Sequence, residues 1–184
     1  GAVDGLPRIL RLLDKQQVPA SLFIPAVSSL LHPQMIPDIL ARKVHEIGIH
    51  GWIHERLPQL NDEKEEQRLL DQSIETLTKA MGKRPVGYRA PSWKFSKYTL
   101  AQVKAAGFLY DSSLMDADVP YELAVDPGVG GGSIVEIPIH WSLDDWEQYC
   151  FVPGVSEGDI ESPVKVQEMW SLELAALREE SGCF

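Results

Sequence analysis

Hydrophobic and polar positions along the chain switch repeatedly between a helical period and short apolar runs. Apolar residues recur at helical spacing over residues 6–13, 34–43, 69–81, 100–106 and 166–177. The short apolar runs between them predict strands over residues 18–25, 44–49, 86–89, 108–110 and 134–139. Strands that alternate with helices in this way are typical of an α/β protein with a parallel sheet and helical crossovers.

The ends of the predicted elements carry residues suited to them. Gly82 and Gly107 are placed to end two helices, and Ser96 is placed to cap the helix that carries Leu100. The acidic run 62–66 predicts a solvated first turn, where negative charge suits the helix dipole. The glycine-rich stretch 126–133 predicts a turn.

Composition and charge narrow the classes of partner. The chain has 184 residues, and 17 basic against 27 acidic residues give a net charge of −10, which argues against nucleic-acid binding. No apolar run approaches the roughly 20 residues needed to cross a bilayer, so we expect no membrane partner. Two cysteines make no disulfide framework and favour a reducing compartment, from which we expect a cytoplasmic location. A homo-oligomer is compatible with the sequence.

The sharpest local feature is the segment 50–54, which reads His-Gly-Trp-Ile-His and directly follows the predicted strand 44–49. Histidines four residues apart lie on one side of a helical turn, so His50 and His54 could reach one metal ion. Imidazole ligands suit zinc, although the spacing alone leaves a purely structural pair equally open. Glu55 could orient an imidazole as a second-shell residue, but we favour a solvated carboxylate.

A second feature follows the predicted strand 86–89. Arg89 could pair with a carboxylate or stabilise a developing oxyanion at the strand end. Trp93 could form a wall on which a sugar ring stacks, and we place Tyr88 with it among the substrate-binding candidates. The alternative is a surface arginine and a core tryptophan.

Two further acidic positions are candidates. Asp111 follows the strand 108–110 and could orient a group in a groove, or it could cap a turn. Asp144 and Asp145 are paired aspartates, which can bind metal or share a proton, although capping is at least as good an explanation. Asp145 and Trp146 are also candidate substrate-binding residues.

Four segments in this order resemble the polysaccharide deacetylase family, also called the NodB-homology or carbohydrate esterase family 4 domain. They are residues 18–25, 45–55, 84–93 and 107–114, and their wording is most similar to the peptidoglycan-deacetylase-like and allantoinase-like branch. The resemblance implies a parallel-stranded, distorted (β/α)7 barrel and a divalent metal, usually zinc.

The resemblance also implies roles for single residues. His50 and His54 match the family's two metal-binding histidines, and Arg89 matches the arginine that contacts the catalytic aspartate. Trp93 matches the groove tryptophan beside it, and Asp111 lies in the family's next groove motif.

Two parts of the family's pattern have no match in this chain. The aspartate motif that supplies the base and third metal ligand is not found, and Asp4 is the only candidate for it. The late histidine that serves as general acid is expected in a strand after the last helix. We therefore expect residues 1–184 to form one incomplete domain that has little activity alone.

The activity that the resemblance implies is metal-dependent hydrolysis of a non-peptide C–N bond. N-deacetylation of an amino-sugar polymer or oligomer is the first expectation, with a saccharide as substrate. One alternative is a hydrolase that opens a small cyclic amide such as allantoin. The other is an inactive saccharide-binding module that uses Trp93 and Trp146.

Overall fold

The computed structural model describes residues 2–150, 152 and 160–180, which divide into two compact units. The first unit contains the chain up to residue 113 together with residues 122–135, and the second contains residues 114–121 and the chain from 136 onward. The expectation of one domain over residues 1–184 stays a prediction.

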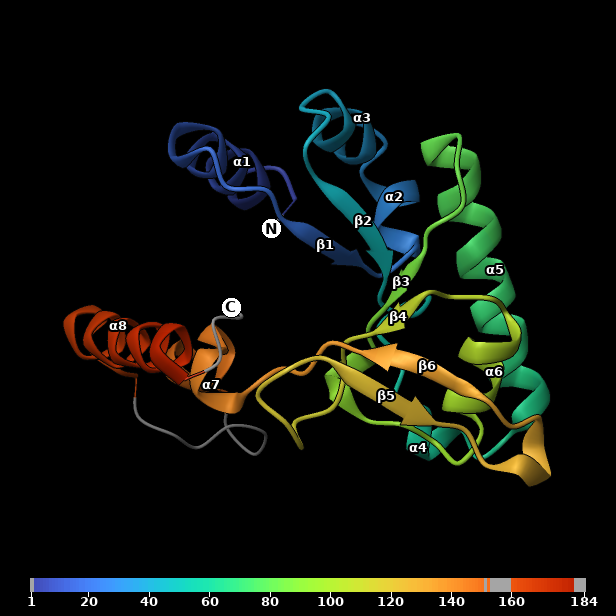
Figure 1. The fold of residues 1–184 in the computed structure, drawn as a ribbon. Coiled ribbons are helices and arrows are strands. Elements are labelled where there is room, and N and C mark those ends of the chain that lie inside the picture. The colour runs from blue at the N-terminus through green and yellow to red at the C-terminus, as the bar shows by residue number, and fades with distance from the viewer. Residues whose placement is uncertain (1, 151, 153–159, 181–184) are drawn as a thin grey trace. The chain divides into compact units, whose positions relative to one another are not determined.

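The sheet places the ends of four parallel strands along one edge. Its strand order is β1-β2-β3-β4-β6-β5. The first four strands pair in parallel. In Figure 1 the arrows of β5 and β6 point in opposite directions. The strands are β1 (Ser21–Ile24), β2 (Glu46–Ile49), β3 (Gly87–Tyr88), β4 (Tyr110–Asp111), β5 (Tyr121–Ala124) and β6 (Ser133–Glu136).

This sheet confirms the predicted α/β class with parallel strands. The order runs from β1 to β5 without returning to β1, so the sheet is open within the described residues, as expected of an incomplete barrel. Strand β5 was not predicted, because its four residues include a glutamate and offer too short an alternation to recognise.

In the part of the chain that the structure describes, the longer predicted helices are present, together with three additional short α-helices. Those predicted are α1 (Gly5–Gln16), α3 (Met35–Leu40), α5 (Glu63–Met81), α6 (Thr99–Ala105) and α8 (Pro163–Glu180). The additional ones are α2 (Val27–Leu31), α4 (Leu57–Leu60) and α7 (Asp145–Tyr149), which are too short to show a helical period in the sequence. None of the helices in the described part of the chain is both long and apolar enough to cross a bilayer.

Helix α5 shows how the sequence pattern builds the core of the first unit. The Asp62 side chain caps its start by accepting hydrogen bonds from two backbone N–H groups of the first turn. Gly82 ends the helix with φ at +71°, a conformation that glycine adopts without steric cost. The buried stripe between these ends contains Leu69, Leu70, Ile74 and Leu77. This stripe lets α5 pack against β2 and the neighbouring helices.

Of the two expectations about helix starts, one was right in part and the other was wrong. Asp62 and Glu63 are exposed at the acidic start of α5, as expected. Glu66 is buried rather than solvated, and its carboxylate accepts hydrogen bonds from the hydroxyls of Ser96 and Thr99, at 2.5 Å each. Ser96 does not cap α6, which begins at Thr99. The serine hydroxyl serves this carboxylate instead, since a buried charge needs hydrogen-bond donors to offset its lost hydration.

Candidate functional site

The two histidines converge from a loop that follows β2. The segment 50–56 is not helical, and Gly51 and His54 both have positive φ, at +72° and +66°. The expected helical turn was therefore wrong as an explanation. The rings nevertheless lie edge to face, with centroids 4.9 Å apart and planes inclined at 72°. We expected a helical turn to align His50 and His54. Instead, a tight turn in which Gly51 and His54 are left-handed brings the two rings together.

His50 is held in an orientation that suits a metal ligand. Its Nδ1 atom lies 2.8 Å from the carbonyl oxygen of Arg89. A carbonyl oxygen only accepts, so Nδ1 carries the hydrogen and donates it, which leaves Nε2 as the ring's acceptor atom. Metal-binding histidines generally fix their second nitrogen in this way.

Burial also keeps the His50 ring neutral. The pKa of His50 is lowered to about 4, mainly by desolvation and also by electrostatic interaction with His54 and Arg89, while the hydrogen bond to the Arg89 carbonyl acts in the opposite direction. At neutral pH the imidazole is therefore uncharged, which is the form that binds metals.

Glu55 takes a position that neither sequence interpretation described. Its carboxylate folds back on the turn and accepts hydrogen bonds from the backbone N–H groups of Trp52, at 2.9 and 3.0 Å, and Ile53, at 2.9 Å. On the other side of the turn, the backbone N–H groups of Ala26 and Val27 donate to the carbonyls of Gly51 and Trp52, at 3.0 Å each. The favoured solvated carboxylate was wrong, because these hydrogen bonds fix Glu55 against the turn.

Arg89 is fixed at the end of β3 by its neighbour strands. Its Nε donates to the carbonyl of Ser112 at 2.8 Å, and its Nη2 donates to the Ser112 hydroxyl at 2.7 Å. The guanidinium carbon lies 4.4 Å from the centroid of the Phe23 ring, within the range of a cation–π contact. Because its carbonyl also receives the His50 hydrogen bond, Arg89 joins the two loops of the site.

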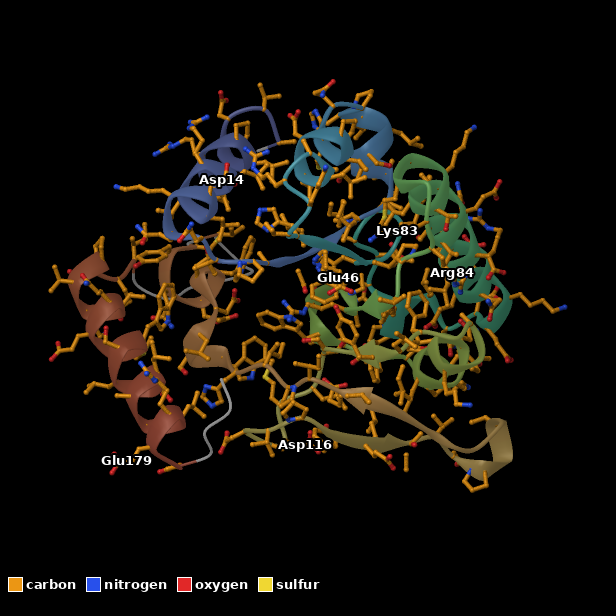
Figure 2. The ribbon with its side chains drawn as sticks, turned by 45° about the horizontal axis from the view of Figure 1, so that its top comes forward. Asp14, Glu46, Lys83, Arg84, Asp116 and Glu179 are labelled. Carbon is orange, nitrogen blue, oxygen red and sulfur yellow. The ribbon has the colours of Figure 1, made fainter. Side chains whose placement is uncertain are left out.

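Beside Arg89, two aromatic rings cover glycine positions of the sheet. Phe23 and Tyr110 meet edge to face with ring centroids 6.2 Å apart. A Cβ at Gly48 would lie 2.6 Å from the Phe23 ring, so the ring needs glycine there. Glu46, labelled in Figure 2, accepts hydrogen bonds from the Tyr110 hydroxyl at 2.9 Å and from Ser21 at 2.8 Å. Burial and then the bond to Glu46 raise the pKa of Tyr110 to about 12.

Asp111 lies at the end of β4 and is fully buried. The Ser113 hydroxyl donates to Asp111 Oδ1 at 2.9 Å and accepts from the backbone N–H of Ala90, also at 2.9 Å. These bonds tie the start of the 90–93 turn to the end of β4. Whether Asp111 orients a catalytic group stays a prediction.

Trp93 lies in the turn after β3 and is half-buried. Both Ser92 and Trp93 have φ of +55°, and each such residue costs about 1–3 kcal/mol when it is not glycine. Two successive left-handed residues give this turn a shape that its own sequence disfavours, so surrounding contacts must hold it.

Tyr88 does not lie where a substrate could reach it. Its side chain is 3% exposed and belongs to the hydrophobic core, where its ring lies 5.8 Å from that of Phe108. Burial raises the pKa of Tyr88 well above its ordinary value, and nearby carboxylates add to this. The substrate-binding assignment is therefore wrong: adjacent residues of a strand point to opposite faces, so Tyr88 and Arg89 do not share one.

Asp145 and Trp146 belong to the second unit. The Asp144 side chain accepts from the backbone N–H of Trp146 at 3.3 Å and caps α7, which confirms capping for that residue. Asp145 is exposed in the first turn of α7, and Trp146 is 49% exposed. Because the histidines belong to the first unit, the substrate-binding role of Asp145 and Trp146 stays a prediction.

The two histidines fit two of the ligand positions of a divalent cation. His50 and His54 supply two converging imidazoles, the first neutral and with Nδ1 already bonded. Catalytic zinc generally has three protein ligands. Within residues 2–150, 152 and 160–180, no group of three or more His, Cys, Asp or Glu side chains is placed to hold a metal. Any third protein ligand is therefore not in place among them.

Sequence reasoning missed three residues that hold the site: Phe23 and Ser112 contact the Arg89 side chain, and Ser113 binds the backbone of Ala90. The two serines directly follow a strand end, and that placement was the signal for Ser112 and Ser113. The role of Phe23 depends on the strand register, which places it opposite Gly48 on β2.

These features define an α/β protein with a two-histidine, arginine-linked site at the ends of parallel strands. Comparison with known proteins then identifies the family: residues 1–110 match the family described as polysaccharide deacetylase, and the chain belongs to it. The peptidoglycan deacetylase of Helicobacter pylori is 33% identical over 187 residues, which cover 90% of this chain and 63% of that protein. The peptidoglycan deacetylase-like protein FGM2 of Gibberella zeae is 31% identical and is covered to 55%, again with 90% of this chain.

Solved structures show the same fold. A Mycobacterium smegmatis protein assigned to the polysaccharide deacetylases is 47% identical with a TM-score of 0.85, over 97% of this chain and 60% of that one. The Puue allantoinase is 26% identical with a TM-score of 0.80, over 96% of this chain and 55% of that one. The chain thus spans between about half and two thirds of the length of these relatives.

Proposed function

We propose that the protein containing this chain is a metal-dependent hydrolase that removes the N-acetyl group from an amino sugar of a peptidoglycan-like polymer. Membership in the polysaccharide deacetylase family and the similarity to peptidoglycan deacetylases support this substrate class. The observation that carries the proposal is the pair of converging imidazoles, of which His50 is neutral and oriented by the Arg89 carbonyl.

In this proposal His50 and His54 hold the cation, with zinc as the first choice for imidazole donors. A zinc ion bound in this way supplies Lewis acidity, which polarises an amide carbonyl and makes water a stronger nucleophile. Overall, water adds to the acetyl carbon and the C–N bond breaks, which releases acetate and a free amine.

In this proposal Arg89 stabilises negative charge at the site and Trp93 orients the sugar. Arg89 presents a guanidinium fixed by Ser112 and Phe23, so its positive charge needs no rearrangement to stabilise an ionised carboxylate or a developing oxyanion. Trp93 lies four residues after Arg89 in the sequence, and its half-buried ring is suited to stacking on the apolar face of a sugar. The family resemblance assigns the general base to an aspartate and the general acid to a late histidine, and neither motif has a match among residues 1–184.

Zinc binding is the first test. We expect the protein to bind zinc in isothermal titration calorimetry, and His50→Ala and His54→Ala each to weaken it by at least about 100-fold, since even outer-shell changes cost roughly 10–100-fold. His32→Ala is the matched control, because His32 lies outside the site, in the segment between α2 and α3, and we expect its zinc affinity to equal that of the wild type. Equal affinity in all four proteins would contradict the proposed metal site.

Substrate choice is tested on the full-length protein. We expect acetate release from N-acetylglucosamine oligomers, abolished in His50→Ala. The similarity to the Puue allantoinase makes allantoin the comparison substrate. Ring opening of allantoin without acetate release would replace deacetylation by cyclic-amide hydrolysis, and saccharide binding that is indifferent to both histidines would indicate a binding module.

A further inference from the structure

We propose that Glu55 is a positioning residue that fixes the spacing of the two histidines by binding the backbone between them. This inference rests on the proposed metal site. The hydrogen bonds of the Glu55 carboxylate go to the backbone N–H groups of Trp52 and Ile53, in the three-residue interval that separates His50 from His54.

The bonds of this interval form two sets on opposite sides. The carbonyls of Gly51 and Trp52 accept from the backbone at the start of α2, while the N–H groups of Trp52 and Ile53 donate to Glu55. The peptide unit between Gly51 and Trp52 is thus held at its carbonyl by α2 and at its N–H by the carboxylate. A peptide plane held at both ends cannot rotate freely, so the directions of the flanking side chains are set.

The Glu55 carboxylate also packs closely against Gly51. A Cβ on Gly51 would lie 2.8 Å from Glu55 Oε1 and 2.8 Å from Pro91 Cγ. Glu55 therefore occupies the volume that a larger side chain at position 51 would need, between the histidine turn and the turn that follows Arg89. Removing the carboxylate would release both the N–H groups and this contact.

A carboxylate near a cation could also act by charge alone, and two substitutions separate the explanations. Glu55→Gln removes the charge but keeps one carbonyl oxygen that accepts from a backbone N–H. Glu55→Ala removes both the charge and the acceptor. If Glu55 acts by positioning, the glutamine variant should lie between wild type and alanine, whereas if it acts by charge the two variants should be equal.

The experiment measures zinc affinity by calorimetry and, without metal, the hydrogen exchange of the Trp52 and Ile53 amides by NMR, on the full-length protein. We expect Glu55→Ala to weaken zinc binding by about 10-fold to 100-fold and Glu55→Gln to weaken it less. Amide protection without metal should be lost in the alanine variant and partly kept in the glutamine variant. Glu75→Ala is the control, because it removes an exposed carboxylate of α5 and should change neither measurement.

The outcomes separate failure of this inference from failure of the proposed function. If zinc affinity depends on His50 and His54 but is unchanged in Glu55→Ala, the positioning role is wrong and the metal site stands. Equal zinc affinities in the alanine and glutamine variants, with amide protection kept in both, would also overturn the positioning role. If wild-type zinc affinity does not depend on the histidines, the proposed function itself fails, whatever the amide exchange shows.

Discussion

The two loops that build the site are stabilised in different ways. The turn 50–55 combines local and distant hydrogen bonds: Glu55 binds backbone N–H groups two and three residues away, and the start of α2 donates to the carbonyls of Gly51 and Trp52. The turn 90–93 is held from a distance: Ser113, 23 residues further along the chain, accepts from the backbone N–H of Ala90. Both loops contain non-glycine residues with positive φ, namely His54 in the first, where Gly51 also has positive φ, and Ser92 and Trp93 in the second.

The two loops differ in the source of the side chain that binds their backbone. The first loop carries its own acceptor, Glu55, whereas the second uses the hydroxyl of Ser113 after β4. Because the Glu55 bonds are local, the segment 50–55 itself encodes part of the geometry of the first loop, and α2 and Arg89 supply the rest. A loop that stores strain keeps its shape only while the neighbouring strand ends hold it. Arg89 connects the two, since its carbonyl binds His50 and its side chain binds Ser112.

The largest effect on stability is expected from Gly51→Ala in the turn 50–55. Alanine at φ +72° is strained, and its Cβ would collide with Glu55 and Pro91, so we expect a loss of about 2–4 kcal/mol in the free energy of unfolding. Urea denaturation measures this loss. Gly82→Ala is a matched control, because Gly82 has φ +71° but open space around its Cβ. It should lose about 1 kcal/mol from strain alone, and equal losses at both sites would show that the Glu55 contact has no weight.

A smaller effect is expected from Ser113→Ala in the loop that is held from a distance. The substitution removes one hydrogen-bond partner from each of two buried groups, the Ala90 N–H and Asp111 Oδ1, so we expect a loss of about 1–3 kcal/mol. Urea denaturation measures the loss. The Trp93 fluorescence should change as well if the turn relaxes. Ser171→Ala removes an exposed serine hydroxyl on α8 and should change stability by less than about 0.5 kcal/mol. Unchanged stability in Ser113→Ala would mean that the 90–93 turn needs no support from β4.

The smallest effect is expected from Tyr110→Phe, which removes the hydroxyl that donates to Glu46. In the wild type the pKa of Tyr110 is raised to about 12 from an ordinary value near 10. The neutral hydroxyl therefore stabilises the fold fully below about pH 10, and this stabilisation is lost as the pH rises through 12. The side chain is half-buried, and we expect at most about 1 kcal/mol at pH 8. The stability difference between Tyr110→Phe and wild type should shrink between pH 10 and 12, and a constant difference would contradict this origin.

The sequence predicted the elements whose signal is local. The buried stripe and capping residues of α5 are visible in the printed sequence, and the segment 50–54 pointed to His50 and His54 before any geometry was known. The explanation for their convergence was wrong, because spacing of four residues does not distinguish a helical turn from a loop with two positive φ angles.

Features that depend on distant neighbours could not be predicted in the same way. The burial of Glu66 follows from hydroxyls about 30 residues away. The position of Arg89 follows from Phe23 on β1 and Ser112 after β4, which only the strand register brings together. The error at Tyr88 was avoidable, since side chains alternate along a strand and its neighbour Arg89 was already assigned to the site.

The central claim is that His50 and His54 bind one cation through a His50 ring whose Nδ1 is protonated. Long-range ¹H–¹⁵N NMR of the histidine rings, recorded before and after addition of zinc, tests it most directly. The His50 ring should already have its hydrogen on Nδ1 without metal, and zinc should shift His50 Nε2 and one nitrogen of His54 together at a single stoichiometric step. A His50 ring protonated on Nε2, or zinc shifts confined to other histidines, would contradict the claim.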